Sequence, residues 1–258
     1  MPSYDKAITV FAPDGQLFQV QYAFEAVNRG SCTIAMKGKD CVVLCVEKNT
    51  VPKLQDSRTI RKIQKIDEHL TITFAGLQAD ARVLIDKTRQ ECQSYRFGYE
   101  DEPSIEYVSR FVAETQQKYT QKGGVRPFGI SCFIAGFEDG LPKLYLTEPS
   151  GAFAEWKAHA IGKKSKDLHQ FLEDKYEHHG QDKSEDEIVK FALETLMEIV
   201  EDQKSMEVCV VRQNGSETMS EEDVGEIVAG IKKERDDAEA AKKAKKQWEK
   251  NTHLYSQI

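Results

Sequence analysis

The order of strand-type and helix-type sequence limits this chain to a few layered folds. Two blocks of β-branched or apolar runs, at 33–74 and 128–161, are each followed by two helical stretches. A last strand and a terminal helix close the chain. Connections within a block are short, as at Lys37-Gly38-Lys39-Asp40, which favours antiparallel pairing because a parallel crossover needs a dozen or more residues. We predict two packed sheets, with a pair of helices attached to each on the outside.

Hydrophobic periodicity sets the expected boundaries. Strands are expected at 33–36, 41–46, 60–66, 70–74, 128–137, 143–146, 152–161 and 206–212. Helices are expected at 16–28, from residue 77 to about 95, from Pro103 to about 122, at 163–177, at 184–202 and from Ser220 onward. No linker divides the 258 residues into separate folded domains. Along the chain we expect an N-terminal arm and helix (1–30), a sandwich domain (31–230) and a charged C-terminal helix or tail (231–258).

Composition narrows the classes of function. The formal net charge of -7 does not suggest nucleic-acid binding by the chain as a whole. No apolar run approaches the roughly 18–20 residues that a membrane span needs. The N-terminus lacks the basic start and apolar stretch of a signal peptide, so we expect a reducing compartment.

The cysteines and histidines favour structural roles. No two cysteines form a Cys-x-x-Cys pair, and their apolar settings predict buried, small hydrophobic side chains. The six are Cys32, Cys41, Cys45, Cys92, Cys132 and Cys209. His178-His179 has acidic neighbours but no evident third ligand, so a surface loop is favoured over a metal site. We predict no metal ion and no cofactor.

The segment ahead of the first strand combines a tight turn with a helix. Pro13-Asp14-Gly15 suits a turn, since proline presets φ, aspartate bonds nearby backbone and glycine accepts positive φ. Apolar residues then recur at helical spacing from Leu17 to Val27, and Gly30 ends the helix. An arm and helix in this place can cover the strands that follow.

Four ordered blocks of sequence resemble proteasome alpha subunits, and the resemblance runs from about residue 3 to residue 230. The blocks are Tyr4 to Ala23, Ala75 to Arg82, Tyr119 to Ser131, and Glu148-Pro149-Ser150-Gly151 with Trp156 and Ala160-Ile161-Gly162. The first ten residues, with Lys53 to Asp56 and Arg58-Thr59, resemble most closely the family member that stands at the fourth position of the eukaryotic alpha ring.

That resemblance implies an α+β fold, a four-layer αββα sandwich of antiparallel sheets of the N-terminal-nucleophile hydrolase (proteasome) type. It implies a non-catalytic alpha subunit of the 20S core particle that gates substrate entry, docks activators and supports assembly for ubiquitin-dependent and ubiquitin-independent degradation. The implied partners are six other alpha subunits, beta-ring subunits, and the C-terminal tails of regulatory-particle ATPases and other activators, without nucleic acid or membrane. The implied location is the cytoplasm and nucleus.

The resemblance also assigns roles to single residues. The family's pore cluster of tyrosine, aspartate, turn proline and helix tyrosine matches Tyr4, Asp5, Pro13 and Tyr22. Lys6, also placed in the gate, stands where the family usually has arginine and lacks that side chain's planar fork.

Two further positions complete the comparison. Gln21 stands where the family usually has glutamate, so a salt link through that glutamate cannot form. The family's lysine for activator tails matches Lys62, whose ammonium group suits a C-terminal carboxylate.

A catalytic interpretation competes with this one. Removal of residues 1–30 would expose Ser31 as an N-terminal nucleophile, with Glu47 and Lys62 where catalytic relatives keep an acid and a lysine. A serine in place of the catalytic family's threonine, and a helix predicted to occupy the cleft above the strands, favour the non-catalytic interpretation.

A third hypothesis concerns the C-terminal tail. Lys242-Lys243-Ala244-Lys245-Lys246 has the composition of a nuclear-import patch. Upstream acidic residues equally suit a solvated helical face with i,i+4 pairs. Residues 248–258 match no pattern of the family.

Overall fold

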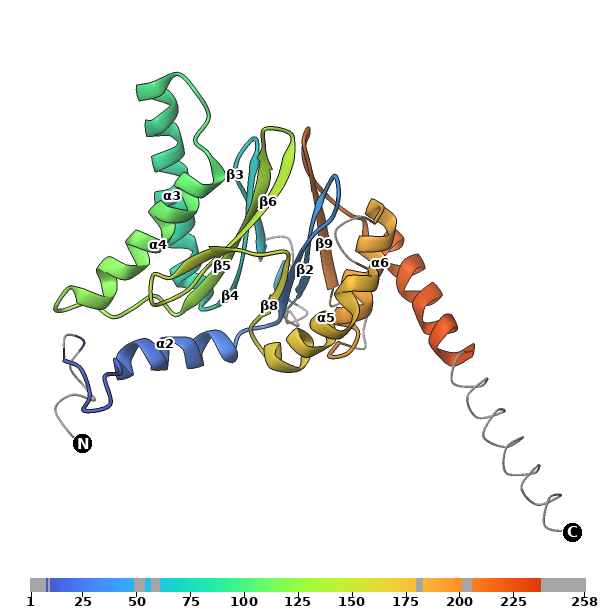
Figure 1. Cartoon of the computed structure of the whole chain (residues 1–258), viewed down its shortest axis with the longest axis horizontal. Coiled ribbons are helices and arrows are strands. Elements are labelled where there is room, and N and C mark those ends of the chain that lie inside the picture. The colour runs from blue at the N-terminus through green and yellow to red at the C-terminus, as the bar shows by residue number, and fades with distance from the viewer. Residues whose placement is uncertain are drawn as a thin grey trace, which may run out of the picture.

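In the computed structural model, two five-stranded antiparallel sheets pack together with helices on their outer sides (Figure 1). The structure describes residues 8, 10–48, 54–56, 61–179, 183–200 and 206–237, with the side chains of 177–179 left out. The predicted αββα sandwich of antiparallel sheets is confirmed. Within these ranges, every helix is too short or too polar to cross a membrane.

The first sheet, sheet A, is built around a central hairpin. Its strands, in spatial order, are β10 (Gly215–Thr218), β9 (Met206–Arg212), β2 (Val42–Glu47), β1 (Thr33–Lys37) and β8 (Ala158–Ile161). Strand β2 pairs with β9 from Val42↔Val211 to Glu47↔Met206. Helices α5 (Ser165–His179) and α6 (Glu185–Leu196) and the helix at 221–237 bury their apolar sides in one cluster with β1, β2 and β9.

The second sheet, sheet B, is a simple meander. Its strands are, in order, β3 (Ile63–Asp67), β4 (Leu70–Gly76), β5 (Ile130–Glu138), β6 (Leu141–Thr147) and β7 (Phe153–Glu155). Helices α3 (Gln78–Tyr99) and α4 (Ile105–Gln121) cover its outer face. Between the two sheets lies an apolar layer in which Leu44 and Phe133 are fully buried, and this burial is the main favourable term in folding.

Local chemistry explains where two of these helices begin. Ser104 caps α4, since its hydroxyl accepts a hydrogen bond from the backbone N–H of Tyr107 at 3.1 Å. Ahead of α6, the carboxylate of Glu187 accepts from the backbone N–H of Ser184 at 3.1 Å, as in a capping box.

The two strand blocks of the sequence do not correspond to the two sheets. The first block divides after β2, and the predicted strand at 152–161 is in fact two strands, β7 in sheet B and β8 in sheet A. The chain crosses between the sheets at Trp156-Lys157. There the N–H of Trp156 donates to the carbonyl of Leu144 in sheet B at 2.9 Å, while the carbonyl of Lys157 accepts from the N–H of Lys37 in sheet A at 2.7 Å.

Smaller differences concern element ends. Strand β10 was not predicted; the hairpin turns at Gln213-Asn214, and Gly215, at φ +123°, begins β10 opposite Arg212. Helix α6 ends at Leu196 rather than near residue 202. The backbone of His178-His179 belongs to α5, so the predicted surface loop there is wrong. The six cysteines are buried and unpaired, as predicted.

Candidate functional site

The N-terminal arm turns at Pro13-Asp14-Gly15, as predicted. The N–H of Ala12 donates to the carbonyl of Gln16 at 2.9 Å, and the N–H of Gly15 donates to the carbonyl of Ala12 at 2.8 Å. Gly15 has φ +80°, which glycine tolerates without strain. Pro13 is exposed on this turn. The other arm residues assigned to the gate, Tyr4, Asp5 and Lys6, lie outside the described residues.

Helix α2 (Phe18–Asn28) follows the turn and packs against β4 and β5 (Figure 1). Ala23 and Val27 are buried on its inner side. Tyr22 is 50% exposed and stacks on Phe18, with ring centroids 6.3 Å apart. The amide of Gln21 donates to the side-chain oxygen of Gln16, a neutral contact at the position where the family usually has glutamate. The helix therefore covers strand ends and presents Tyr22 outward.

Glycines allow the chain to pass close to the sheet where α2 ends. A Cβ atom on Gly30 would collide with the backbone nitrogen of Gly76, and one on Gly76 would collide with the carbonyl oxygen of Gly129. These backbone contacts leave no room for a side chain. They fix the junction between α2 and the sandwich.

Ser31, Glu47 and Lys62 meet directly after this junction, as the catalytic interpretation expected. The Nζ of Lys62 donates to the carbonyl of Ser31 at 3.4 Å, and the N–H of Cys32 donates to Oε2 of Glu47 at 3.0 Å. The Ser31 hydroxyl is buried and has no hydrogen-bond partner among the described residues. While residues 1–30 are attached, its backbone nitrogen is in the peptide bond with Gly30, and the free amine that serves as base in N-terminal nucleophiles is not formed.

Lys62 is more enclosed than an open carboxylate receptor would be. Only 7% of the residue is exposed in the single chain. Burial lowers the pKa of Lys62 to about 8, against the opposing effect of Glu47, Cys32 and Glu207. At neutral pH the side chain is therefore still mostly an ammonium group, held toward the carbonyl of Ser31.

Two of the family-like blocks meet at Asp80 and Arg126. The Arg126 guanidinium donates to both carboxylate oxygens of Asp80, at 2.6 and 2.8 Å, and the N–H of Gly129 donates to the same carboxylate at 3.1 Å. Partial burial opposes ionisation, but these bonds outweigh it and lower the pKa of Asp80. Both motifs thus serve to fix the loop at 126–129 to the first turn of α3.

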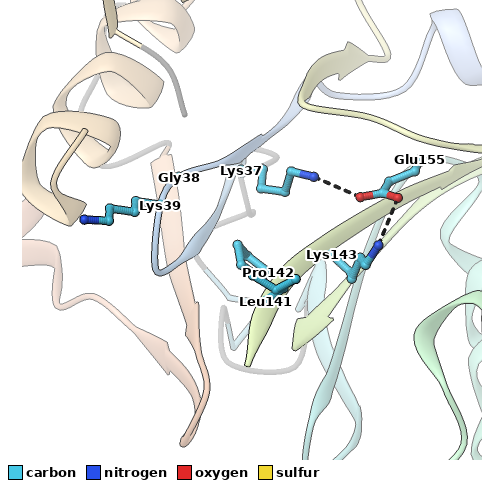
Figure 2. A pocket seen from close by; sticks show the side chains of 7 residues that line it. All are labelled: Lys37, Gly38, Lys39, Leu141, Pro142, Lys143 and Glu155. Atoms are coloured by element: carbon cyan, nitrogen blue, oxygen red, sulfur yellow. Dashed lines mark hydrogen bonds and ion pairs between the residues drawn. The ribbon is translucent and has the colours of Figure 1, made fainter. Parts of the chain in front are cut away.

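A further polar cluster joins the two sheets at the other end of β1 (Figure 2). Oε1 of Glu155 lies 2.9 Å from Nζ of Lys37 in sheet A, and Oε2 lies 3.2 Å from Nζ of Lys143 in sheet B. Partial burial disfavours the charge, but the two ammonium groups outweigh it and lower the pKa of Glu155. No local pattern pointed to this cluster, because its members come from β1, β6 and β7.

Two family models match the chain. Residues 27–211 match the proteasome subunit family, and residues 4–26 match the N-terminal signature of A-type proteasome subunits. The chain belongs to the proteasome subunit family. Its N-terminal signature places it among the alpha-type subunits of the 20S core particle, which are non-catalytic, so Ser31 is not a nucleophile here.

Individual relatives agree along nearly the whole chain. The chain is 51% identical to the alpha type-7 proteasome subunit of Dictyostelium discoideum over 247 residues, which covers 95% of this chain and 97% of that protein. It is 50% identical to the alpha type-7 subunit of Solanum lycopersicum, over 94% of each chain. It is also 50% identical to the alpha type-7-B subunit of Arabidopsis thaliana, over 94% of this chain and 98% of that one.

Proposed function

We propose that the chain occupies the fourth position of the eukaryotic alpha ring and contributes to the gate and the activator-docking surface of the core particle. The observation that carries the gate assignment is the placement of α2, which packs over strand ends and leaves Pro13 and Tyr22 exposed. The ring position rests on the resemblance of the first ten residues, Lys53 to Asp56 and Arg58-Thr59 to the family member at that position. Its proposed partners are six other alpha subunits, beta-ring subunits and the C-terminal tails of activators. Its proposed location is the cytoplasm and nucleus.

In the gate, Tyr4, Asp5 and Lys6 act with Pro13 and Tyr22. Phenol hydroxyls and a carboxylate can form hydrogen bonds across subunit boundaries and hold the arm in one of two positions. Residues 1–30 form the gate segment in this proposal, 31–230 the sandwich, and 231–258 the charged tail.

Lys62 receives the C-terminal carboxylate of an activator tail. The carboxylate replaces the carbonyl of Ser31 as the acceptor for the ammonium group, which lies 3.4 Å from that carbonyl in the single chain. The net gain from one such pair is small, because the ammonium group of Lys62 is already largely buried and the carboxylate must lose its hydration to reach it. Firm docking therefore depends on several tails binding at once.

The test uses an assembled core particle in which this chain carries Lys62→Ala. We expect weaker activator binding and lower activated peptidase turnover, with assembly intact by native mass spectrometry. Lys39→Ala, an exposed lysine on the turn after β1, is the matched control. Normal activator affinity in the Lys62→Ala particle would show that the residue does not receive tails.

The gate assignment has its own test. A particle that lacks residues 1–10 of this chain, together with the corresponding arm of a ring neighbour, is expected to hydrolyse small peptides faster without an activator. An unchanged basal rate, with normal subunit stoichiometry, counts against the assignment.

Residues 240–258 of the C-terminal tail, which lie outside the described residues, are proposed to aid nuclear import through Lys242 to Lys246. Deleting residues 240–258 is expected to lower the nuclear fraction of the protein. An unchanged distribution by fluorescence microscopy would reject this role and leave the solvated-helix interpretation.

A further inference from the structure

A groove with cationic walls lies between β3, the edge strand of sheet B, and helix α3. Its volume is about 340 Å³, and its charged lining consists of Arg61, Lys65, Arg82 and Arg89. Gln64 and Gln78 add amide groups. The groove adjoins Lys62 in sequence, but Lys62 is not among its lining residues.

Ion pairs compensate little of the positive charge of this groove, although Arg61 interacts at longer range with the carboxylate of Glu207. Arg89 has a carboxylate nearby, with its Nη1 3.3 Å from Oδ1 of Asp86. Among the described residues, no carboxylate lies within ion-pair distance of Arg61, Lys65 or Arg82. These three side chains are exposed. A concentrated positive potential on a chain of net charge -7 is a local feature that favours a negatively charged partner.

The groove is held in shape by Arg89. Its Nε and Nη2 donate to the carbonyl of Lys65 at 3.2 and 2.8 Å, and Nη2 also donates to Oε1 of Gln64 at 3.2 Å. Arg89 thus ties α3 to the edge strand and keeps the two walls at a fixed separation. Arg61, Lys65 and Arg82 remain available to a ligand.

Helix α3 adds to the same potential. Gln78, Arg82 and Arg89 fall on one side of the helix because their spacing is close to whole turns. Gln78 is the first helical residue, and Leu77 at the N-cap offers no side-chain acceptor to the first N–H groups. The positive end of the helix dipole therefore lies beside the cations of the groove, and Asp80 in the first turn, which is paired with Arg126, offsets part of it.

We propose that this groove binds an acidic segment of a partner polypeptide through side-chain carboxylates at Arg61, Lys65 and Arg82. Arginine forks match carboxylates in bidentate geometry, and the narrow space beside an edge strand suits an extended chain. The overall negative charge of the protein opposes a long nucleic acid. The inference rests on the proposed docking function, to which it adds a contact separate from the terminal carboxylate at Lys62.

The test measures binding of fluorescein-labelled peptides of about ten residues to the full chain by fluorescence anisotropy. One peptide is rich in glutamate and has an amidated C-terminus, so only its side chains carry negative charge. We expect its Kd to rise about tenfold in the double variant Arg61→Gln/Arg82→Gln, and to rise steeply with salt. Thermal unfolding of each variant checks that it is folded.

Control variants and control ligands separate the outcomes. Arg110→Gln, an exposed arginine of α4 paired with Glu106, should leave the Kd unchanged, and so should Lys62→Ala. The groove is rejected if the double variant binds like Arg110→Gln, or if a glutamine counterpart of the peptide binds equally well. An oligouridylate of equal charge tests for nucleic acid. If it binds more tightly than the glutamate-rich peptide and this binding is lost in the double variant, an acidic peptide is not the ligand of the groove. A glutamine peptide with a free C-terminus tests the proposed function separately. If its binding is lost in Lys62→Ala, the docking role of Lys62 stands whether or not the groove binds acidic segments.

Discussion

The Nζ atom of Lys62 lies 3.4 Å from the carbonyl oxygen of Ser31. The ammonium group is buried in the folded protein. Catalytic relatives keep a lysine next to their nucleophile at this position. In this non-catalytic subunit Ser31 is not a nucleophile, so the same lysine is free for a different task. A buried cation with a neutral acceptor is well suited to exchange that acceptor for a carboxylate.

Tail binding at Lys62 should therefore depend on pH near 8. Because the pKa of Lys62 is lowered to about 8, the ammonium group is present at pH 7 and mostly lost at pH 9. We expect the affinity of a peptide with a free C-terminal carboxylate to fall up to about tenfold over this range. Lys62→Arg, which stays charged, should abolish the pH dependence. Equal wild-type affinity at both pH values would contradict a role for this ammonium group.

Glu155 should stabilise the sandwich by linking its sheets. Glu155→Gln removes the ion pairs to Lys37 and Lys143 and is expected to lower the free energy of unfolding by about 1 kcal/mol, a modest value because the carboxylate is partly solvated. Its pKa is lowered in the folded chain, so this stability is present above the unfolded pKa and is lost as pH falls through the folded one.

Urea unfolding at neutral and acidic pH would measure this effect. Arg110→Gln, which breaks the exposed i,i+4 pair with Glu106, is the control and should cost less than about 0.5 kcal/mol. An equal loss in the two variants would show that the inter-sheet link adds nothing specific.

Gly30 and Gly98 should respond in opposite ways to alanine. A Cβ atom on Gly30 meets the backbone of Gly76, whereas one on Gly98, inside α3, meets nothing within 4 Å. We expect Gly30→Ala to destabilise the chain by more than about 1 kcal/mol. Gly98→Ala should stabilise it by about 0.5 to 1 kcal/mol through helix propensity. Thermal unfolding of both variants decides the matter, and a stable Gly30→Ala chain would disprove the tight junction below α2.

The six thiols should resist alkylation in the folded chain. All are buried, and burial raises the pKa of Cys32 to about 12 and of Cys41 to about 11, so little thiolate is present at pH 8. Iodoacetamide followed by intact mass measurement should show slow labelling without denaturant and complete labelling in guanidinium. Rapid labelling of even one thiol without denaturant would contradict this expectation and would show that the core opens at that cysteine.

Local sequence was sufficient for most elements but not for their assignment to sheets. The turn at Pro13-Asp14-Gly15 and helix α2 follow from residue types and spacing alone. The crossing at Trp156-Lys157 does not follow from them. There the strand run is interrupted because Trp156 bonds to Leu144 in one sheet and Lys157 bonds to Lys37 in the other, and both partners are remote in sequence.

The site shows the same limit. Ser31, Glu47 and Lys62 could be grouped only through the family resemblance, since Lys62 contacts Ser31 across segments that are remote in sequence. The cationic groove depends on the approach of Arg61 to Arg82, which periodicity within either element does not predict. Contacts between elements, rather than within them, decide these features.

The pairing of β2 with β9 has a consequence for synthesis on the ribosome. The hairpin of β1 and β2 emerges among the first strands, yet its neighbour on one side, from Val42↔Val211 to Glu47↔Met206, emerges near the end of translation. Until then the hairpin has an open edge of unpaired backbone groups, a template for pairing with other nascent chains. Sheet A is therefore completed late, and a factor that shields this edge during translation would act before any ring can form.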